Sequence, residues 1–353
     1  MISATLLIRM PKGAIFMKQY LGIEKDAQYL VDMIYAPMYT KLCMHAIEMD
    51  IFSSLTESIS AEELANKLEW HEVNTGLFLD ALAGMKLLKK TEGLYQNTST
   101  ANKYLVRSSN CYMGGYMLMC NQFSASDNSD ISLLVQKGPQ PMPESTTEQF
   151  YFAEQISAMR VAQVGARSQE TVDILSSLPE FVSSKKMLDL GCGTGMLGIA
   201  AAKANNNLTA VLFDTPAMGG GIAESIKQSG IEERLKAMTG DYMTDDIGED
   251  YDLIIAIGTL NFAKHAMDTI MERLYLALNK GGVLVASGDG IHSEGTMPID
   301  MVSSWLTYAM QGMNLGMPIG LIPDAAKKAG FRSVDSFTVP SYSGTANINI
   351  IRK

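Results

Sequence analysis

The amino-acid sequence predicts an α/β protein with a mostly parallel sheet, helices on both faces of that sheet, and a mostly helical domain in front of it. In the carboxyl-terminal half, uninterrupted apolar stretches such as Leu253–Ile257 alternate with stretches of helical spacing, which is typical of buried parallel strands and their crossover helices. In the amino-terminal part, apolar residues from Leu30 to Met49 recur instead at helical spacing. The length of 353 residues favours two domains.

Charge and composition indicate the kind of partner to expect. The formal net charge is −10 and no basic run is longer than a pair such as Lys89-Lys90, so we expect no nucleic-acid partner. No window reaches the roughly 18 uncharged apolar residues of a membrane-spanning helix, and Arg9 and Lys12 interrupt the apolar start, which argues against a signal peptide. The four cysteines form no Cys-x-x-Cys pair, which predicts reduced thiols in a cytoplasmic protein and no metal site.

The first hundred residues predict a winged helix. A Ser-x-x-Glu capping box at Ser60–Glu63 opens one short helix, and Gly93 suits a tight turn between two strands. The elements are expected in the order helix Ile23–Leu55, helix Ala61–Leu68, helix Glu72 to about Leu88, and a β-wing over Lys89–Tyr95.

A winged helix raises the question of DNA binding. The second of its two short helices would read bases with its first residues, but these include Glu72 and Asn74, followed by Leu77 and Phe78. Because this surface is acidic and apolar, we expect it to support packing against a second copy of the chain, and a homodimer formed through this domain.

The middle of the chain gives a weaker pattern. Gly138–Pro143 predicts a break, and Glu148 to about Leu175 predicts a helix that bridges the two halves. We expect an N-terminal helical, winged-helix dimerisation domain over 1–107, linker helices that contribute to the substrate pocket over 108–180, and a ligand-binding α/β domain over 181–353.

The α/β domain is expected to alternate strands and helices and to close with two strands. The expected strands are Met187–Leu190, Ala210–Phe213, Leu235–Met238, Leu253–Ile257, Val283–Ala286, Val334–Val339 and Ala346–Ile351, and the expected helices are Met196–Ala204, Ile222–Ser229, Asp268–Leu278 and one that ends at Ala325–Ala329.

A glycine-rich segment, Gly191–Gly195, lies between the first of these strands and the helix after it. Ligands of open α/β sheets bind at such carboxyl ends of strands, and glycines let the backbone approach a ligand closely. The loop alone is ambiguous, because Gly193, Gly195 and Gly198 also fit the dinucleotide pattern GxGxxG.

Acidic residues at the strand ends favour a cationic ligand over a dinucleotide. Asp189 precedes the loop, where a carboxylate would oppose a pyrophosphate but suits the sulfonium and ammonium groups of S-adenosylmethionine (SAM). Asp214 can accept hydrogen bonds from ribose hydroxyls, while Asp241 and Tyr242 are placed for the adenine. The set predicts SAM binding and leaves a nicotinamide cofactor as a remote alternative.

The chain resembles the SAM-dependent O-methyltransferases of the plant caffeate and bacterial small-molecule type (O-methyltransferase family 2). The resemblance covers about Ala27 to Ile351 and implies a Rossmann-like class I methyltransferase domain behind a winged-helix dimerisation domain. It also implies SAM contacts at Gly191, Asp214, Asp241 and Tyr242, with Met159 near the methyl group; Gly193, Gly195 and Gly258 are assigned to the same site. Its marks are Ala61–Ala65, Leu87–Tyr95, Asn97–Thr100, Tyr104-Leu105, Phe152–Met159, the glycine loop, Phe213–Pro216, Gly240–Met243 and Ala329–Phe331.

The resemblance fails at the general base. Plant members place a histidine where this chain aligns Asn261, and the two supporting acidic positions align with Ser287 and roughly Gly316. An amide has no useful basicity, so Asn261 could orient a substrate but not deprotonate it. His265 is either a displaced base or a surface histidine. Asp289 and His292 are further polar candidates, or parts of an ordinary loop.

The segment after the fifth strand predicts a pocket lid. Trp305, Tyr308, Met310 and Met313 favour an apolar, ring-bearing acceptor, although this segment could equally be a helix that packs on the linker. We expect SAM-dependent methylation of a small hydrophobic acceptor, with oxygen favoured. Transfer to carbon, nitrogen or sulfur, SAM binding without transfer, and an NAD-dependent oxidoreductase remain alternatives.

Overall fold

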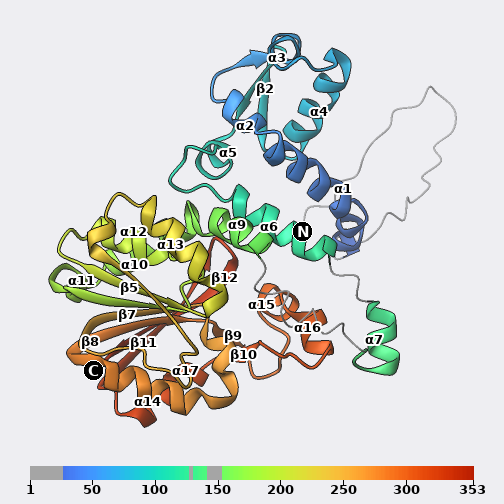
Figure 1. Ribbon diagram of the computed structural model, residues 1–353. Coiled ribbons are helices and arrows are strands. Elements are labelled where there is room, and N and C mark those ends of the chain that lie inside the picture. Colours follow the sequence, from blue (N-terminus) through green and yellow to red (C-terminus); the bar gives the residue numbers. More distant parts are fainter. Residues whose placement is uncertain (1–26, 127–129, 141–152) are drawn as a thin grey trace, which may run out of the picture.

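The computed structural model describes residues 27–126, 130–140 and 153–353 (Figure 1). A small amino-terminal domain stands on the linker helices, and these lie along one side of a larger α/β domain (Figure 1). The amino-terminal domain and the α/β domain are therefore joined by helices rather than by an extended linker.

The amino-terminal domain has the predicted winged-helix order, but the first helix, expected over Ile23–Leu55, is two helices separated at Asp50, whose φ is 53°. Residues 23–26 lie outside the described residues. In the capping box of this domain the Glu63 N–H donates to the Ser60 hydroxyl at 3.1 Å, and the Ser60 N–H donates to the Glu63 carboxylate at 3.0 Å. The second short helix ends at Gly84, earlier than expected, because Lys86 turns the chain with a φ of 62° into the wing. The elements are α1 (Gln28–Glu48), α2 (Ile51–Ser54), β1 (Ile59–Ser60), α3 (Ala61–Leu68), α4 (Glu72–Gly84), β2 (Leu88–Thr91), β3 (Leu94–Asn97) and α5 (Ser99–Tyr104).

The linker consists of several helices. The single helix expected over Glu148–Leu175 is two helices, broken at Gly165, whose φ is 77° and whose missing Cβ would lie 2.3 Å from the Tyr112 carbonyl oxygen. The close passage of the segment between α5 and α6, which carries Tyr112, thus leaves no room for a side chain at the break. Residues 148–152 lie outside the described residues. The linker helices are α6 (Gly114–Ser126), α7 (Ile131–Lys137), α9 (Ala153–Gln163), α10 (Ala166–Ser176) and α11 (Pro179–Ser183).

The α/β domain is built on a seven-stranded sheet in the order β11-β12-β8-β7-β4-β5-β6. Five strands are parallel, and β12 and β11 close the sheet antiparallel, as predicted. The strands are β4 (Lys186–Leu190), β5 (Thr209–Asp214), β6 (Leu235–Thr239), β7 (Tyr251–Ile257), β8 (Leu278–Ser287), β11 (Ser333–Ser341) and β12 (Gly344–Arg352).

Helices cover both faces of this sheet (Figure 1). α10, α12 (Met196–Ala204) and α13 (Gly219–Lys227) lie on one face, and α14 (Met267–Ala277) and α17 (Leu321–Ala329) lie on the other. Two separate clusters of buried apolar side chains fill the two interfaces. The core of the domain is therefore two layers with the sheet between them.

Smaller elements follow the strand ends. They are η3 (Pro216–Met218), η4 (Glu232–Arg234), η5 (Leu260–Ala266), β9 (Asp289–Ile291), α15 (Ile299–Ser303), α16 (Leu306–Met310) and β10 (Met317–Pro318). The strand order reverses between β4 and β7, so the loops that leave these two strands run in opposite directions and open a crevice at their carboxyl ends.

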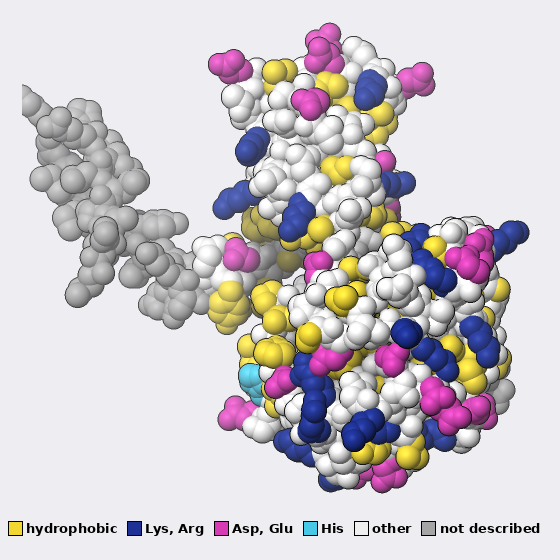
Figure 2. Space-filling model, turned by 90° about the vertical axis from the view of Figure 1, so that its left-hand side faces the viewer, with side chains coloured by type: hydrophobic (Ala, Val, Ile, Leu, Met, Phe, Trp, Pro, Cys, Tyr) yellow, Lys and Arg dark blue, Asp and Glu magenta, His cyan; other side chains and the backbone are white. Residues whose placement is uncertain are grey.

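The molecular surface carries both signs of charge. On the face shown in Figure 2, Lys and Arg side chains are interspersed with Asp and Glu side chains over the α/β domain. Within the described residues, no helix combines the length and the apolar character that crossing a membrane requires.

Candidate functional site

The glycine loop lies at the point where the strand order reverses. Gly191, Gly193 and Gly195 have φ values of 64°, 59° and 82°, in the left-handed region that glycine adopts without strain. A Cβ on Gly191 would lie only 2.0 Å from the hydroxyl oxygen of Thr259, which follows β7. The loops after β4 and β7 are therefore in direct contact, and this contact requires a glycine.

Two carboxyl groups accept hydrogen bonds from the backbone of the glycine loop and of α12, the helix that follows it. Asp189 is 2% exposed, and its Oδ2 accepts a hydrogen bond from the Gly198 N–H at 2.8 Å. Asp214, at the end of β5, accepts from the Gly193 and Thr215 N–H groups, each at 2.7 Å. Burial raises the pKa of Asp189 to about 7 and also raises the pKa of Asp214. Both acids therefore lie where an additional positive charge would stabilise their ionised forms.

The loop after β6 completes this edge of the sheet. Asp241 is exposed, and its Oδ1 accepts from the Met243 N–H at 2.8 Å. The Tyr242 hydroxyl donates to the Thr259 carbonyl oxygen at 3.0 Å, which connects this loop to the one after β7. Gly258, with a φ of 71°, precedes that carbonyl. The structure thus brings the sequence-predicted cofactor residues to one edge.

A linker residue that the sequence analysis missed holds the glycine loop from above. Gln163, at the end of α9, is 3% exposed. Its Oε1 accepts from the Thr194 hydroxyl at 2.5 Å and from the Thr194 N–H at 3.2 Å, and its Nε2 donates to the Cys192 carbonyl at 3.0 Å. A Cβ on Gly193 would lie 2.8 Å from both Gln163 Nε2 and the Met159 sulfur. The spacing in the sequence could have indicated this role, because Gln163 lies four residues after Met159 and therefore on the same helix face.

The candidate catalytic residues Asn261 and His265 both lie in η5. Asn261 is half-buried and donates from its Nδ2 to the Leu315 carbonyl at 2.9 Å, which fixes η5 to the segment before β10. Lys264 also bonds η5 to this segment, because its Nζ donates to the Gly316 carbonyl at 2.5 Å. His265 is exposed at the end of η5. The side chain of Asn261 is therefore held inside the molecule, whereas that of His265 is not.

Of the two further polar candidates, Asp289 is wholly buried at 0% exposure. Its Oδ1 accepts from the side-chain amides of Asn347 at 3.1 Å and Asn349 at 2.8 Å, and its Oδ2 accepts from the Gly320 N–H at 3.0 Å. These bonds connect β9 to β12 and to the start of α17, which is a structural role. His292 is exposed.

The residues expected to form a lid lie on and beside α15 and α16. The rings of Trp305 and Tyr308 meet edge to face, with centroids 5.7 Å apart and planes at 61°. Met310 and Met313 are half-buried nearby in the chain. The Gln140 N–H donates to the Gln311 side chain at 2.8 Å, so the linker also contacts this segment. This contact supports the interpretation of a helix packed on the linker, while the pocket lid stays a prediction.

Comparison with known proteins agrees with this two-part construction. Residues 31–107 match the O-methyltransferase dimerisation domain, and residues 161–287 match the methyltransferase small domain. The chain thus joins an O-methyltransferase dimerisation domain to a methyltransferase domain, and it is a methyltransferase. The expectation of a SAM-dependent methyltransferase is thereby confirmed at the level of the family.

Relatives and solved structures extend the similarity over most of the methyltransferase. It is 24% identical over 267 residues to the N,N-dimethyltransferase OxyT of Streptomyces rimosus, covering 74% of this chain and 77% of the relative. It is 23% identical over 279 residues to 3-hydroxy-5-methyl-1-naphthoate 3-O-methyltransferase of Streptomyces sahachiroi, covering 77% and 79%. The structure of human N-acetylserotonin methyltransferase in complex with SAM superposes with a TM-score of 0.71 at 20% identity, covering 94% of this chain and 98% of that one. This last similarity shows the fold.

The residues at the sheet edge fit a SAM molecule. The glycine loop offers a backbone free of side chains between the two strands, and Asp214 keeps acceptor capacity beyond its two backbone bonds. Burial raises the pKa of Asp189 and of Asp214, and for Asp189 this effect outweighs the lowering by the nearby Arg167. A cationic ligand would supply a further positive partner, whereas a pyrophosphate would not.

Proposed function

We propose that this methyltransferase transfers a methyl group from SAM to a small, hydrophobic, ring-bearing acceptor, with oxygen as the favoured acceptor atom. The observation that carries the proposal is the joining of the glycine loop, the buried Asp189, the half-buried Asp214 and the linker residues Met159 and Gln163 at one edge of the sheet. We keep the division into domains 1–107, 108–180 and 181–353 as part of this proposal.

Within the proposed site each residue has a distinct task. Asp214 would accept the ribose hydroxyls, Asp241 and Tyr242 would face the adenine, and Met159 would lie beside the reacting group. SAM supplies an already activated methyl group, so the protein must chiefly align the acceptor and exclude water. Met159 and the half-buried aromatic pair at the start of α16, Trp305 and Tyr308, suit the second task, because they present apolar surface.

The acceptor atom is the open part of the proposal. The two relatives described above are named for different acceptor atoms, nitrogen and oxygen. Asn261, which aligns with the base of plant relatives, cannot remove a proton, and its Nδ2 is already engaged by the Leu315 carbonyl. An acceptor that ionises easily, or a nitrogen, carbon or sulfur nucleophile, would need little help from a base.

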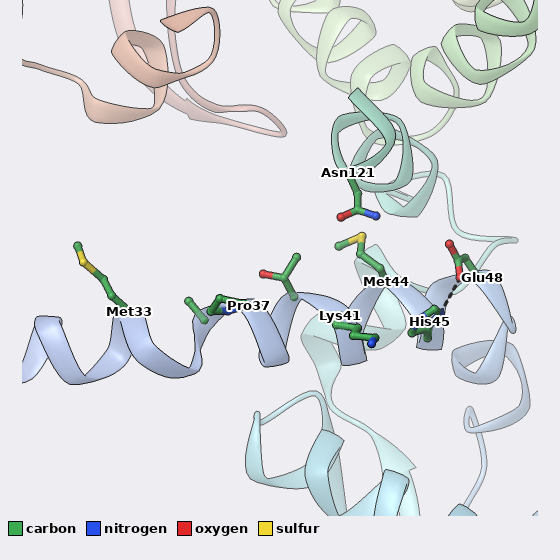
Figure 3. Close-up of a pocket in the computed structure, with 9 residues that line it drawn as sticks. Met33, Pro37, Lys41, Met44, His45, Glu48 and Asn121 are labelled. Atoms are coloured by element: carbon green, nitrogen blue, oxygen red, sulfur yellow. Dashed lines mark hydrogen bonds and ion pairs between the residues drawn. The ribbon is translucent and has the colours of Figure 1, made fainter. Parts of the chain in front are cut away.

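We further propose that the enzyme acts as a homodimer through its amino-terminal domain, the part that matches the dimerisation domain. A groove of about 470 Å³ runs beside α1 and is bordered on the other side by Asn121 of α6 (Figure 3). Met33, Pro37 and Met44 line it from α1. Large apolar side chains that the described residues leave uncovered continue along this helix: Tyr29, Leu30, Met33, Ile34, Tyr35, Met38 and Tyr39 are 47% to 71% exposed.

The proposal is tested first by cofactor binding. We expect the wild-type chain to bind SAM and S-adenosylhomocysteine in calorimetry, and Asp214→Ala to weaken both by roughly 10- to 100-fold, the range for hydrogen bonds to a charged group. The control is Asp268→Ala, which removes an exposed carboxylate 2.9 Å from Lys328 and should leave affinity unchanged. Equal binding by Asp214→Ala and wild type would refute this cofactor site.

A second measurement separates a transferase from a protein that only binds SAM. Incubation with SAM and a panel of phenols, aromatic amines and thiols should release S-adenosylhomocysteine with at least one class. Tight SAM binding without release from any class would favour the non-catalytic alternative, and thermal stabilisation by NAD but not by SAM would favour the oxidoreductase.

A further inference from the structure

A cationic side chain that the proposed function does not use lies at the crevice between β4 and β7. Arg167, near the start of α10, donates from Nη2 to the carbonyl oxygen of Ile257, the last residue of β7, over a long 3.4 Å. A Cβ on Gly258 would lie 3.7 Å from the same nitrogen. Gly258 adjoins Thr259, which contacts Gly191 of the glycine loop. The guanidinium therefore lies at the strand-order reversal, beside the proposed cofactor site.

The charge of Arg167 is not neutralised by the described residues around it. None of the ion pairs formed within the described residues includes Arg167, and its Nε is buried without a hydrogen-bond partner there. Glu170, three residues along α10, instead accepts from the Ser341 hydroxyl at 2.8 Å and the Tyr342 N–H at 3.1 Å. An arginine with one long hydrogen bond retains most of its five donors for a ligand.

The aromatic neighbours do not supply the missing negative charge. The Tyr342 ring lies 5.8 Å from the guanidinium carbon, and Tyr116 packs edge to face on that ring at 5.0 Å. Burial raises the pKa of both phenols, so both are neutral near pH 7. Asp189 is close enough for Arg167 to lower its pKa, but the larger effect of burial raises that pKa, and Asp189 is bonded to the Gly198 N–H.

We propose that Arg167 binds the carboxylate of the amino-acid part of SAM. This inference rests on the proposed function. The carboxylate is the one anionic group of that cofactor; the acids Asp189 and Asp214 suit its cationic groups, and Arg167 is the nearby base. A planar guanidinium can donate two parallel hydrogen bonds to a carboxylate, and water exclusion in the crevice strengthens such a pair.

The test compares cofactors with and without the carboxylate. Calorimetry on wild type and Arg167→Gln uses SAM, S-adenosylhomocysteine and decarboxylated SAM. We expect Arg167→Gln to weaken SAM and S-adenosylhomocysteine by roughly 10- to 100-fold and to leave the weaker binding of decarboxylated SAM unchanged. Arg160→Gln is the control, because Arg160 lies on the neighbouring α9 and its guanidinium is bonded to Gln228.

Two results would overturn the assignment of Arg167. One is unchanged affinity of Arg167→Gln for SAM; the other is an equal loss for SAM and decarboxylated SAM, which would indicate a structural role. Where Arg167→Gln does not fold, Arg167→Lys gives the same comparison, since a lysine keeps the charge and loses the paired geometry. Absence of SAM binding by the wild-type chain would instead refute the proposed function.

Discussion

At the scale of single residues, the proposed site is defined by carboxyl groups whose pKa values are raised by burial. Asp189 is buried beneath the glycine loop with one backbone donor, and Asp214 accepts two backbone N–H groups at the crevice. Such groups hold their protons more tightly than exposed carboxyls, and a bound cation reverses this. Cofactor binding should therefore depend on pH.

The pH dependence follows from the pKa of about 7 that burial gives Asp189. A cationic ligand favours the ionised carboxylate, so affinity for SAM should rise as the pH increases through 7, by up to about tenfold between about pH 6 and about pH 8. The rise should be smaller for S-adenosylhomocysteine, which lacks the sulfonium charge.

Calorimetry across this pH range checks the expectation, with Asp189→Asn as the matched variant. The amide oxygen of an asparagine can still accept from the Gly198 N–H but does not titrate. A pH profile that is the same in wild type and Asp189→Asn would show that another group is responsible.

Residue types at strand ends were readable from the sequence, whereas contacts between distant segments were not. Asp189 and Asp214 were found because each adjoins a recognisable strand. Gln163 was missed because its partners, Thr194 and Cys192, lie 29 to 31 residues away, and an amide in a helix has many possible uses. Arg167 was missed for the same reason: its position depends on the end of β7, 90 residues later.

At the scale of elements, the glycine loop and the start of α12 show how closely backbone geometry determines the site. The helix over Met196–Ala204 was predicted at its observed bounds, because a glycine run precedes it and its apolar residues are regularly spaced. The two-helix form of α9 and α10 was not predicted. Gly165 lies within a helical pattern, and the carbonyl of Tyr112 leaves no room for a side chain there, which sequence spacing does not reveal.

Gly191 of the glycine loop can be compared with Gly230, a glycine outside the loop that has a similar φ. Gly191 has a φ of 64° and its Cβ would meet the Thr259 hydroxyl oxygen, whereas Gly230 has a φ of 71° and nothing within 4 Å of its Cβ position. Gly230→Ala should cost only the strain of the left-handed conformation, about 1–2 kcal/mol.

Gly191→Ala should cost that strain plus a displacement of the β7 loop, and so lose at least about 1 kcal/mol more together with most of its SAM affinity. Urea unfolding and calorimetry on both variants provide the comparison. Equal stability and equal affinity would mean that the contact with Thr259 is not needed.

At the scale of the whole molecule, α1 presents large apolar side chains that no other part of the described chain covers. Ile34 is 71% exposed and Met38 is 56% exposed, although both lie on the element that begins the dimerisation domain. We expect the double variant Ile34→Glu/Met38→Glu to be a monomer in sedimentation equilibrium, because a charge on each side chain opposes burial of this face.

The control for this variant is Val182→Glu, at a 73% exposed position on α11 of the α/β side. It should stay dimeric. Dimers of unchanged stability in the α1 variant would place the subunit contact elsewhere.

The hydrogen bonds of Gln163 have a consequence for any shortened form of this enzyme. Residues 181–353 contain every strand of the large sheet, yet the amide that caps the turn after β4 comes from α9, outside that range. A fragment cut at residue 181 would leave the Thr194 N–H and hydroxyl and the Cys192 carbonyl to be satisfied by solvent. The sheet of such a fragment could fold while the glycine loop that would bind the cofactor stays unformed. The linker helix α9 is therefore part of the proposed cofactor site.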